Sequence, residues 1–62
     1  MSAFKFELNQ KVLISVSGER GMVRSRCEYG DGSENNYFIR YLSSDGRAVE
    51  VWWSESALKA DV

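Results

Sequence analysis

The sequence predicts an all-β fold, a small barrel of five short strands that forms one domain over residues 1–62. Apolar and polar residues alternate with a period of two, and glycine-bearing turns divide the alternating runs. Many of the apolar residues are β-branched or aromatic, which favours strands over helices. Because closing a sheet removes its exposed edges, strands this short in a chain this small favour a barrel.

The first alternating run covers residues 11–16 and leads into a turn that contains two glycines. One face of this run is expected to point into the core, because its residues are all apolar: Val12, Ile14 and Val16. In the turn, Gly18 and Gly21 can both take positive φ, so the chain can reverse within a few residues.

The second run covers residues 22–29, and its two faces differ in polarity. The face expected to point inward consists of Val23, Ser25, Cys27 and Tyr29. The opposite face is mostly charged and includes Arg24 and Arg26, so we expect it to face solvent. Residues 30–36 follow as a loop that is too acidic and flexible to belong to the core.

The third run, residues 37–42, and the fourth, residues 47–53, are joined through Asp45-Gly46, which is a strong hairpin signal. Arg40 marks the outer side of the third run. The positions expected inside are therefore Tyr37, Ile39 and Tyr41 in the third run and Val49, Val51 and Trp53 in the fourth. The positions expected outside are Phe38, Arg40, Leu42, Ala48, Glu50 and Trp52.

The C-terminal part of the chain predicts a short helical turn near the C-terminus over residues 54–58, with Ser54 as its N-cap. Leu58 is expected to plug the end of the barrel. Residues 59–62 then form either a fraying tail or a last edge strand, and the sequence leaves both open.

The residue inventory argues against catalysis. The sequence contains no histidine, and Cys27 is its one cysteine. A cysteine nucleophile needs a neighbouring base, so we interpret Cys27 as a small buried residue on a strand. The same inventory predicts no metal site. We therefore expect a protein that is not an enzyme and that carries no cofactor.

The sequence also favours a cytoplasmic protein without membrane contact. A single cysteine cannot form an internal disulfide, whereas small secreted domains usually depend on several. No apolar run approaches the ~20 residues that a membrane helix requires, and residues 1–5 lack the features of a secretory signal. The net charge of −1 gives no strong general attraction to nucleic acid.

Two stretches carry a family resemblance. The first is Ser17-Gly18-x-x-Gly21-x-Val23, and the second runs from Tyr37-x-Ile39-x-Tyr41 through Asp45-Gly46 to Val51-Trp52-Trp53-Ser54-Glu55-x-x-Leu58. This layout resembles SH3-like barrels of the KOW/Tudor type, in particular small single-domain proteins of bacterial and phage genomes. The resemblance covers nearly the whole chain. It implies a five-stranded SH3-like barrel, and it implies contacts to RNA or ribosome-associated partners, which KOW-type domains often make.

Distant fold kinship extends to the plasmid-borne type II dihydrofolate reductase, a tetramer of similar barrels whose active pore carries Val-Gln-Ile-Tyr. The corresponding stretch here is Val49-Glu50-Val51-Trp52. Glu50 stands where that family has an amide that binds both ligands, and four carboxylates in one pore would repel an anionic dinucleotide and folate. An oligomeric pore enzyme is therefore the third of three interpretations.

The leading hypothesis is a non-catalytic interaction module that binds an unknown protein partner, or a second copy of itself. Adjacent strand residues point to opposite faces, so Trp53 is expected in the core and Trp52 outside. An exposed tryptophan beside other apolar side chains often marks a contact surface. The binding residues expected on this outer face are Trp52, Phe38, Arg40 and Glu50. The competing possibility is that residues 4–8 fold back and cover Trp52.

The runner-up is a nucleic-acid-binding module, because arginines interleaved with an aromatic residue on a sheet can bind phosphate and stack bases. Its expected residues are Arg24, Arg26 and Arg40. The alternative is a solvated face in which Glu28 and Glu50 neutralise the arginines across strands. One further hypothesis assigns three tyrosines to a cage for methylated lysine or arginine, against a role as core walls: Tyr29, Tyr37 and Tyr41.

Overall fold

A computed structural model describes residues 4–61 and contains five strands and one short 3₁₀ turn. In chain order these are β1 (Lys11–Ile14), β2 (Arg20–Cys27), β3 (Asn36–Leu42), β4 (Ala48–Ser54), η1 (Glu55–Ala57) and β5 (Leu58–Ala60). The predicted all-β fold, its five strands and its C-terminal turn are thus confirmed. Of the two alternatives for the C-terminal tail, the edge strand is observed at Lys59 and Ala60, while Val62 lies outside the described residues.

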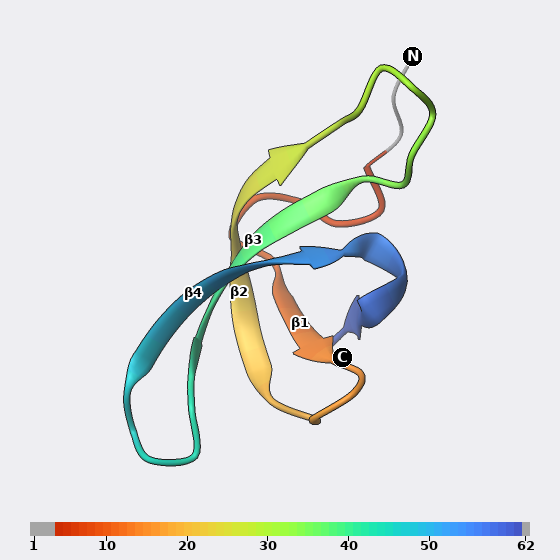
Figure 1. Cartoon of the computed structure of the whole chain (residues 1–62). Helices are drawn as coiled ribbons and strands as arrows, with labels where there is room; N and C mark the ends of the chain where they lie inside the picture. The colour runs from red at the N-terminus through yellow and green to blue at the C-terminus, as the bar shows by residue number, and fades with distance from the viewer. Residues whose placement is uncertain (1–3, 62) are drawn as a thin grey trace.

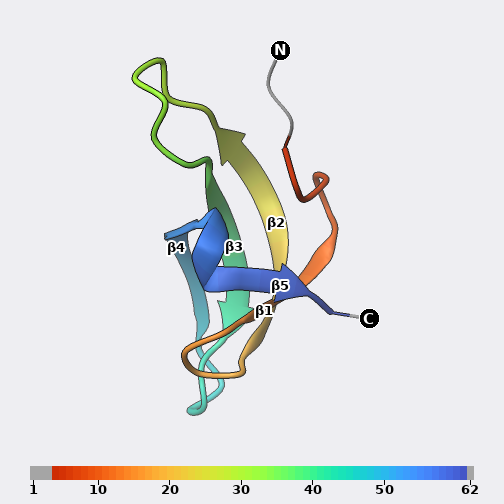
Figure 2. The same ribbon diagram turned by 90° about the vertical axis from the view of Figure 1, so that its right-hand side faces the viewer.

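The strands form one antiparallel sheet in the order β4-β3-β2-β1-β5 (Figure 1). This order, with η1 between the last two strands, is consistent with an SH3-like fold. The predicted closure into a barrel is not observed, since β4 and β5 are the two edges of the sheet and do not pair. Figure 2 shows the reason: β5 is short and runs across the direction of β3 and β4, so it cannot lie alongside β4.

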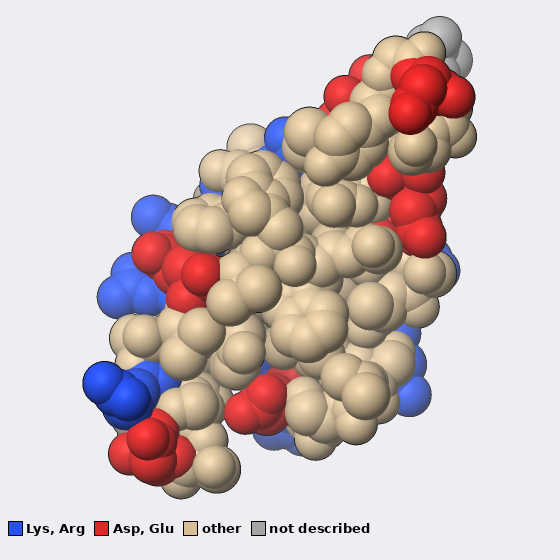
Figure 3. Space-filling view, viewed as in Figure 1, with Lys and Arg blue, Asp and Glu red and all other residues tan. Residues whose placement is uncertain are grey.

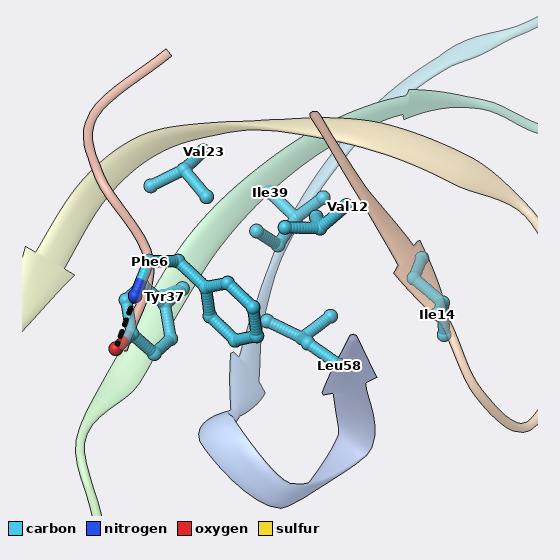
Figure 4. Close-up of a cluster of buried hydrophobic side chains, with 7 residues drawn as sticks. All are labelled: Phe6, Val12, Ile14, Val23, Tyr37, Ile39 and Leu58. Atoms are coloured by element: carbon cyan, nitrogen blue, oxygen red, sulfur yellow. Dashed lines mark hydrogen bonds between the residues drawn. The ribbon is translucent and has the colours of Figure 1, made fainter. Parts of the chain in front are cut away.

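The core lies on the concave side of the sheet (Figure 4). Its buried residues are Phe6, Val12, Ile14, Val23, Tyr37, Ile39 and Leu58. The five aliphatic members were all predicted as core from the sequence. Phe6, which belongs to the segment before β1, packs edge-on against Tyr37 with ring centroids 5.2 Å apart. A segment without regular structure therefore supplies one of the largest fully buried side chains of the core.

Two valines predicted inside are exposed. Val16 has 80% of its surface exposed, because β1 ends at Ile14 and the chain turns away there. The turn is closed by hydrogen bonds from the Gly18 N–H to the Ile14 carbonyl (2.7 Å) and from the Ile14 N–H to the Glu19 carbonyl (2.8 Å). Val51 is 40% exposed, since it lies on the edge strand β4, where the open sheet leaves it half uncovered.

A β-bulge in β2 changes which side chains face the core. Val23 pairs with Ile39, but the next pair along the strand is Ser25 with Phe38, so Arg24 is the extra residue. Two residues on β2 therefore oppose one on β3, and the alternation of the two faces reverses beyond Arg24.

The reversal overturns the predicted orientation of the second half of β2. Arg26 pairs with Tyr37, whose side chain is buried, so Arg26 lies on the concave side rather than outside. Ser25, predicted inside, is exposed, and Cys27 is only partly buried. Tyr29, also predicted inside, lies beyond the end of β2 and is exposed.

Glycine is required at position 21 because β3 lies too close for a side chain there, and not because of its backbone angles. Gly18 has the positive φ predicted for it (+75°), but Gly21 does not. A Cβ at Gly21 would lie 2.5 Å from Cγ2 of Ile39 and 3.0 Å from the carbonyl oxygen of Arg40. Since such distances are too short for carbon atoms, β2 and β3 can hold Ile39 in this place only if residue 21 lacks a side chain.

The hydroxyl of Tyr37 connects three parts of the chain. It accepts hydrogen bonds from the backbone N–H groups of Lys5 (3.0 Å) and Phe6 (3.4 Å), and it donates one to the carboxylate of Glu55 in η1. Burial, and secondarily the Glu55 hydrogen bond, raises the pKa of Tyr37. The hydrogen bond from Tyr37, joined by the Lys5 N–H, lowers the pKa of Glu55.

Ser54 has the predicted N-cap position, but the predicted capping by its side chain is wrong. Ser54 occupies the N-cap position with extended backbone angles, but its side chain makes no capping hydrogen bond. The carboxylate of Glu34, in the loop between β2 and β3, accepts hydrogen bonds from the Ser56 N–H (2.7 Å) and hydroxyl (3.1 Å) instead. The first turn of η1 is thus satisfied from a distant loop.

Replacing Gly21 by alanine is expected to destabilise the fold by roughly 1–3 kcal/mol, the usual cost of forcing an extra methyl into a packed region. Urea denaturation measures this cost. Gly30→Ala is the matched control, because a Cβ there has no atom within 4 Å and the backbone does not need positive φ. Equal urea midpoints for the two variants would show that the close contact between residue 21 and β3 does not limit the size of the side chain there.

Tyr37→Phe removes the shared hydroxyl and leaves the Phe6 N–H without that acceptor. We expect a loss of about 2–3 kcal/mol in the free energy of unfolding, since a hydrogen bond to a charged group is lost along with the partner of a buried donor. Tyr29→Phe removes an exposed hydroxyl and should change the unfolding midpoint little. A neutral Tyr37→Phe variant would show that the hydroxyl is dispensable.

The lowered pKa of Glu55 predicts a loss of stability in acid. In the unfolded chain Glu55 takes up a proton near its ordinary pKa of 4.5, whereas the folded protein resists protonation until lower pH. The contribution of Glu55 to the free energy of unfolding is therefore complete above pH 4.5 and is lost as the pH falls through its pKa in the folded protein. Urea midpoints measured from pH 7 to pH 3 should fall less steeply for Glu55→Gln than for the wild type. Glu28→Gln, at an exposed glutamate, should leave the slope unchanged.

Candidate interaction surface

The convex face of β3 and β4 carries an exposed aromatic pair. Phe38 and Trp52 are direct cross-strand partners, and their ring centroids lie 5.1 Å apart at an interplanar angle of 41°. Trp52 is 47% exposed, while Phe38 is half-buried beneath it. Cross-strand packing against Phe38 restricts the orientation of the indole. The pair therefore presents a large apolar surface to solvent in a defined position.

The segment predicted as a possible cover for Trp52 lies on the other side of the sheet. Phe6 is buried against Tyr37, and the ring of Phe4 stands edge-on to the same tyrosine at 6.1 Å. Both contacts are on the concave side, whereas Trp52 is on the convex side. The alternative in which residues 4–8 cover Trp52 is therefore wrong.

Trp53, the neighbour of Trp52 in the sequence, points to the opposite side of the sheet. Trp53 points to the concave side and packs against the buried cluster, as its position next to Trp52 predicted. It is only partly buried, and its indole N–H has no hydrogen-bond partner within the described part of the chain. The strand thus divides the two indoles between core and surface.

The other residues predicted for this surface lie two pairs further along the same two strands, on the same face. Arg40 is opposite Glu50, the Ile39–Val51 pair separates them from the Phe38–Trp52 pair in the ladder, and both side chains are exposed. The four residues named from the sequence are therefore brought together on one face. We call this group, Phe38, Arg40, Glu50 and Trp52, the Trp52 surface. Figure 3 shows that the middle of the molecule beside β4 is mainly uncharged and that charged side chains gather toward its borders.

A hollow of about 420 Å³ adjoins the Trp52 surface. It is lined by apolar side chains such as Met22 and Leu42, by three cations, Lys11, Arg20 and Arg40, and by the carboxylate of Asp61. The Arg20 guanidinium lies 3.6 Å from that carboxylate. Sequence reasoning missed this hollow, because its cations come from three strands and meet only through the register that aligns Lys11, Met22 and Arg40 in one row.

The three arginines predicted as a nucleic-acid site do not share a face. Arg26 lies on the concave side, where its guanidinium stacks 4.4 Å from the centre of the Phe4 ring and donates a hydrogen bond to the Phe6 carbonyl (3.2 Å). Arg24 is the exposed extra residue of the bulge, and Arg40 is on the convex face. The three arginines are separated because the bulge turns Arg26 to the concave side, where it packs against the N-terminal segment.

The tyrosines do not converge into a cage. Tyr37 is fully buried and its hydroxyl is bonded within the protein, so it is a core wall as the alternative interpretation held. Tyr41 is partly buried against the core, and Tyr29 is exposed beyond the end of β2. A cage requires several rings exposed to one ligand, which this arrangement does not provide.

Within residues 4–61, no group of three or more Cys, Asp or Glu side chains is placed to hold a metal ion. No helix in this part of the chain is long and apolar enough to cross a membrane. No protein-family model matches the sequence, and no curated protein matches it. Any statement about function therefore depends on the surface itself.

Proposed function

We propose that this protein is a non-catalytic interaction module that binds a protein partner through the Trp52 surface. The observation that carries the proposal is the indole of Trp52, which is about half exposed although it is packed on Phe38. Tryptophan and arginine are the residues that most often dominate binding energy at protein interfaces. Here Arg40 lies on the same face as Trp52, two residues along β3 from Phe38, the direct cross-strand partner of Trp52.

The rigidity of the platform supports the same proposal. The pairing of β3 with β4 continues without a shift from Asn36↔Ser54 to Leu42↔Ala48. Trp52 and Arg40 therefore sit in the middle of a regular ladder and not on a loop. A side chain held in this way loses little conformational freedom when a partner covers it.

The second candidate is binding of a phosphate-bearing ligand such as nucleic acid. It no longer rests on Arg24 and Arg26 but on the hollow beside the Trp52 surface, where Arg40 is joined by Lys11 and Arg20. One of these cations is already paired with Asp61, and the net charge of −1 supplies no general attraction to polyanions. Protein binding is therefore the better supported of the two.

Affinity capture with the immobilised chain tests the proposal. Trp52→Ala should abolish capture of a protein partner, while Leu8→Ala, which truncates an exposed leucine in the N-terminal segment, should retain it. Capture should also persist when the salt concentration is raised, because an apolar contact is not screened. Unchanged capture by Trp52→Ala would overturn the proposal. Capture that nuclease treatment or salt abolishes would favour the second candidate.

A further inference from the structure

The two edges of the sheet are protected to very different degrees. β5 is three residues long and carries the exposed Lys59 at its centre, and a short charged edge of this kind resists pairing with other chains. β4 is seven residues long, has Glu50 as its single charged residue, and contains no proline and no bulge. Figures 1 and 2 show it as the outermost strand with no other segment along its outer side.

The hydrogen-bonding pattern fixes which residues of β4 face outward along the edge. The Ser43 N–H donates to the Arg47 carbonyl and the Glu55 N–H to the Asn35 carbonyl, each at 2.9 Å. Because hydrogen-bonded and non-hydrogen-bonded pairs alternate in an antiparallel ladder, the odd-numbered residues of β4 bond to β3. The even-numbered residues therefore direct their backbone N–H and C=O groups to the open edge: Ala48, Glu50, Trp52 and Ser54.

This pattern limits how a second copy of β4 can pair with the first in a symmetric, antiparallel way. Even-numbered residues must face even-numbered residues, so the two-fold axis must pass at a residue and not between two. Only an axis at residue 50, 51 or 52 pairs most of the seven residues of β4. An axis at Glu50 sets two carboxylates directly opposite each other, which is unfavourable. An axis at Trp52 leaves the first two residues of β4 without strand partners. An axis at Val51 pairs all seven residues and places each Glu50 opposite the other copy's Trp52.

We infer that the partner of the β4 edge is a second copy of this chain, paired antiparallel about Val51. The inference deepens the proposed function, on which it rests for the idea that this side of the molecule is a contact surface. On the concave side, Val51 of each copy covers the other, which explains why a valine in the core phase is left 40% exposed. On the convex side, the two Trp52 surfaces become one.

The pairing also explains why association stops at two copies. A symmetric β4–β4 contact uses up the open edge of both chains, and the outer edges of the doubled sheet are then the two copies of β5. Those edges are short and charged, so the sheet is not extended further. The expected species is a dimer, not a filament.

Disulfide trapping tests the register directly. In a Cys27→Ser background, Val51→Cys places two thiols at a non-hydrogen-bonded pair whose Cα atoms are about 4.5 Å apart, which is within disulfide range. Diamide, which accepts the two electrons and two protons that the thiols lose, should convert this variant to a covalent dimer. Val49→Cys is the matched control on the same strand and side. Its thiols would lie about four residues apart along the paired strands, so it should not cross-link.

Two charge variants separate this inference from the proposed function. Val51→Lys sets two ammonium groups opposite each other, so its dimer dissociation constant in sedimentation equilibrium should rise about tenfold or more. Trp52→Lys instead faces Glu50 of the other copy, so it should keep the dimer while losing capture of a protein partner. A monomeric wild type with no Val51→Cys cross-link overturns the inference but leaves the Trp52 surface proposal standing. Cross-linking of Val49→Cys as efficient as that of Val51→Cys would overturn the register.

Discussion

The buried hydroxyl of Tyr37 is the interaction on which the arrangement of this small protein depends. Its ring forms part of the core, so its polar end must find partners inside the protein. It finds them in the backbone of Lys5 and Phe6 and in the carboxylate of Glu55. One side chain of β3 thereby positions both the segment before β1 and the turn before β5, neither of which pairs with β3.

Those two segments close the concave side of the sheet and leave the convex side uncovered. The N-terminal segment contributes Phe6 to the core and covers Arg26, while η1 leads into β5, whose Leu58 joins the same cluster. Nothing in residues 4–61 lies over Trp52 in the same way. The surface proposed for binding is thus exposed because the segments outside the sheet pack on its concave side. The β4 edge is left open for the same reason.

The distribution of cations follows from the same packing. Arg26 is held by the Phe4 ring and the Phe6 carbonyl, with Glu7 at 3.9 Å, so it serves the fold. Three other cations, Lys11, Arg20 and Arg40, are brought together around the hollow by strand register. Arg40 belongs both to that hollow and to the Trp52 surface. A protein partner on this face would therefore meet an apolar centre whose border carries both cations and the carboxylates of Glu50 and Asp61.

The sequence alone determined the strands, their turns and the opposite orientations of Trp52 and Trp53, because side-chain alternation and turn chemistry are local properties. It also brought Phe38, Arg40, Glu50 and Trp52 to one face, since alternation along two strands joined by a hairpin suffices for that. The tertiary structure decided the rest. The extra residue Arg24 reversed the two faces of β2 beyond the bulge. The N-terminal segment packs on the concave side, where it bonds to the Tyr37 hydroxyl. The sheet does not close, so Val51 on its edge strand is left partly exposed. Each of these depends on contacts between residues far apart in the chain, which no local pattern records.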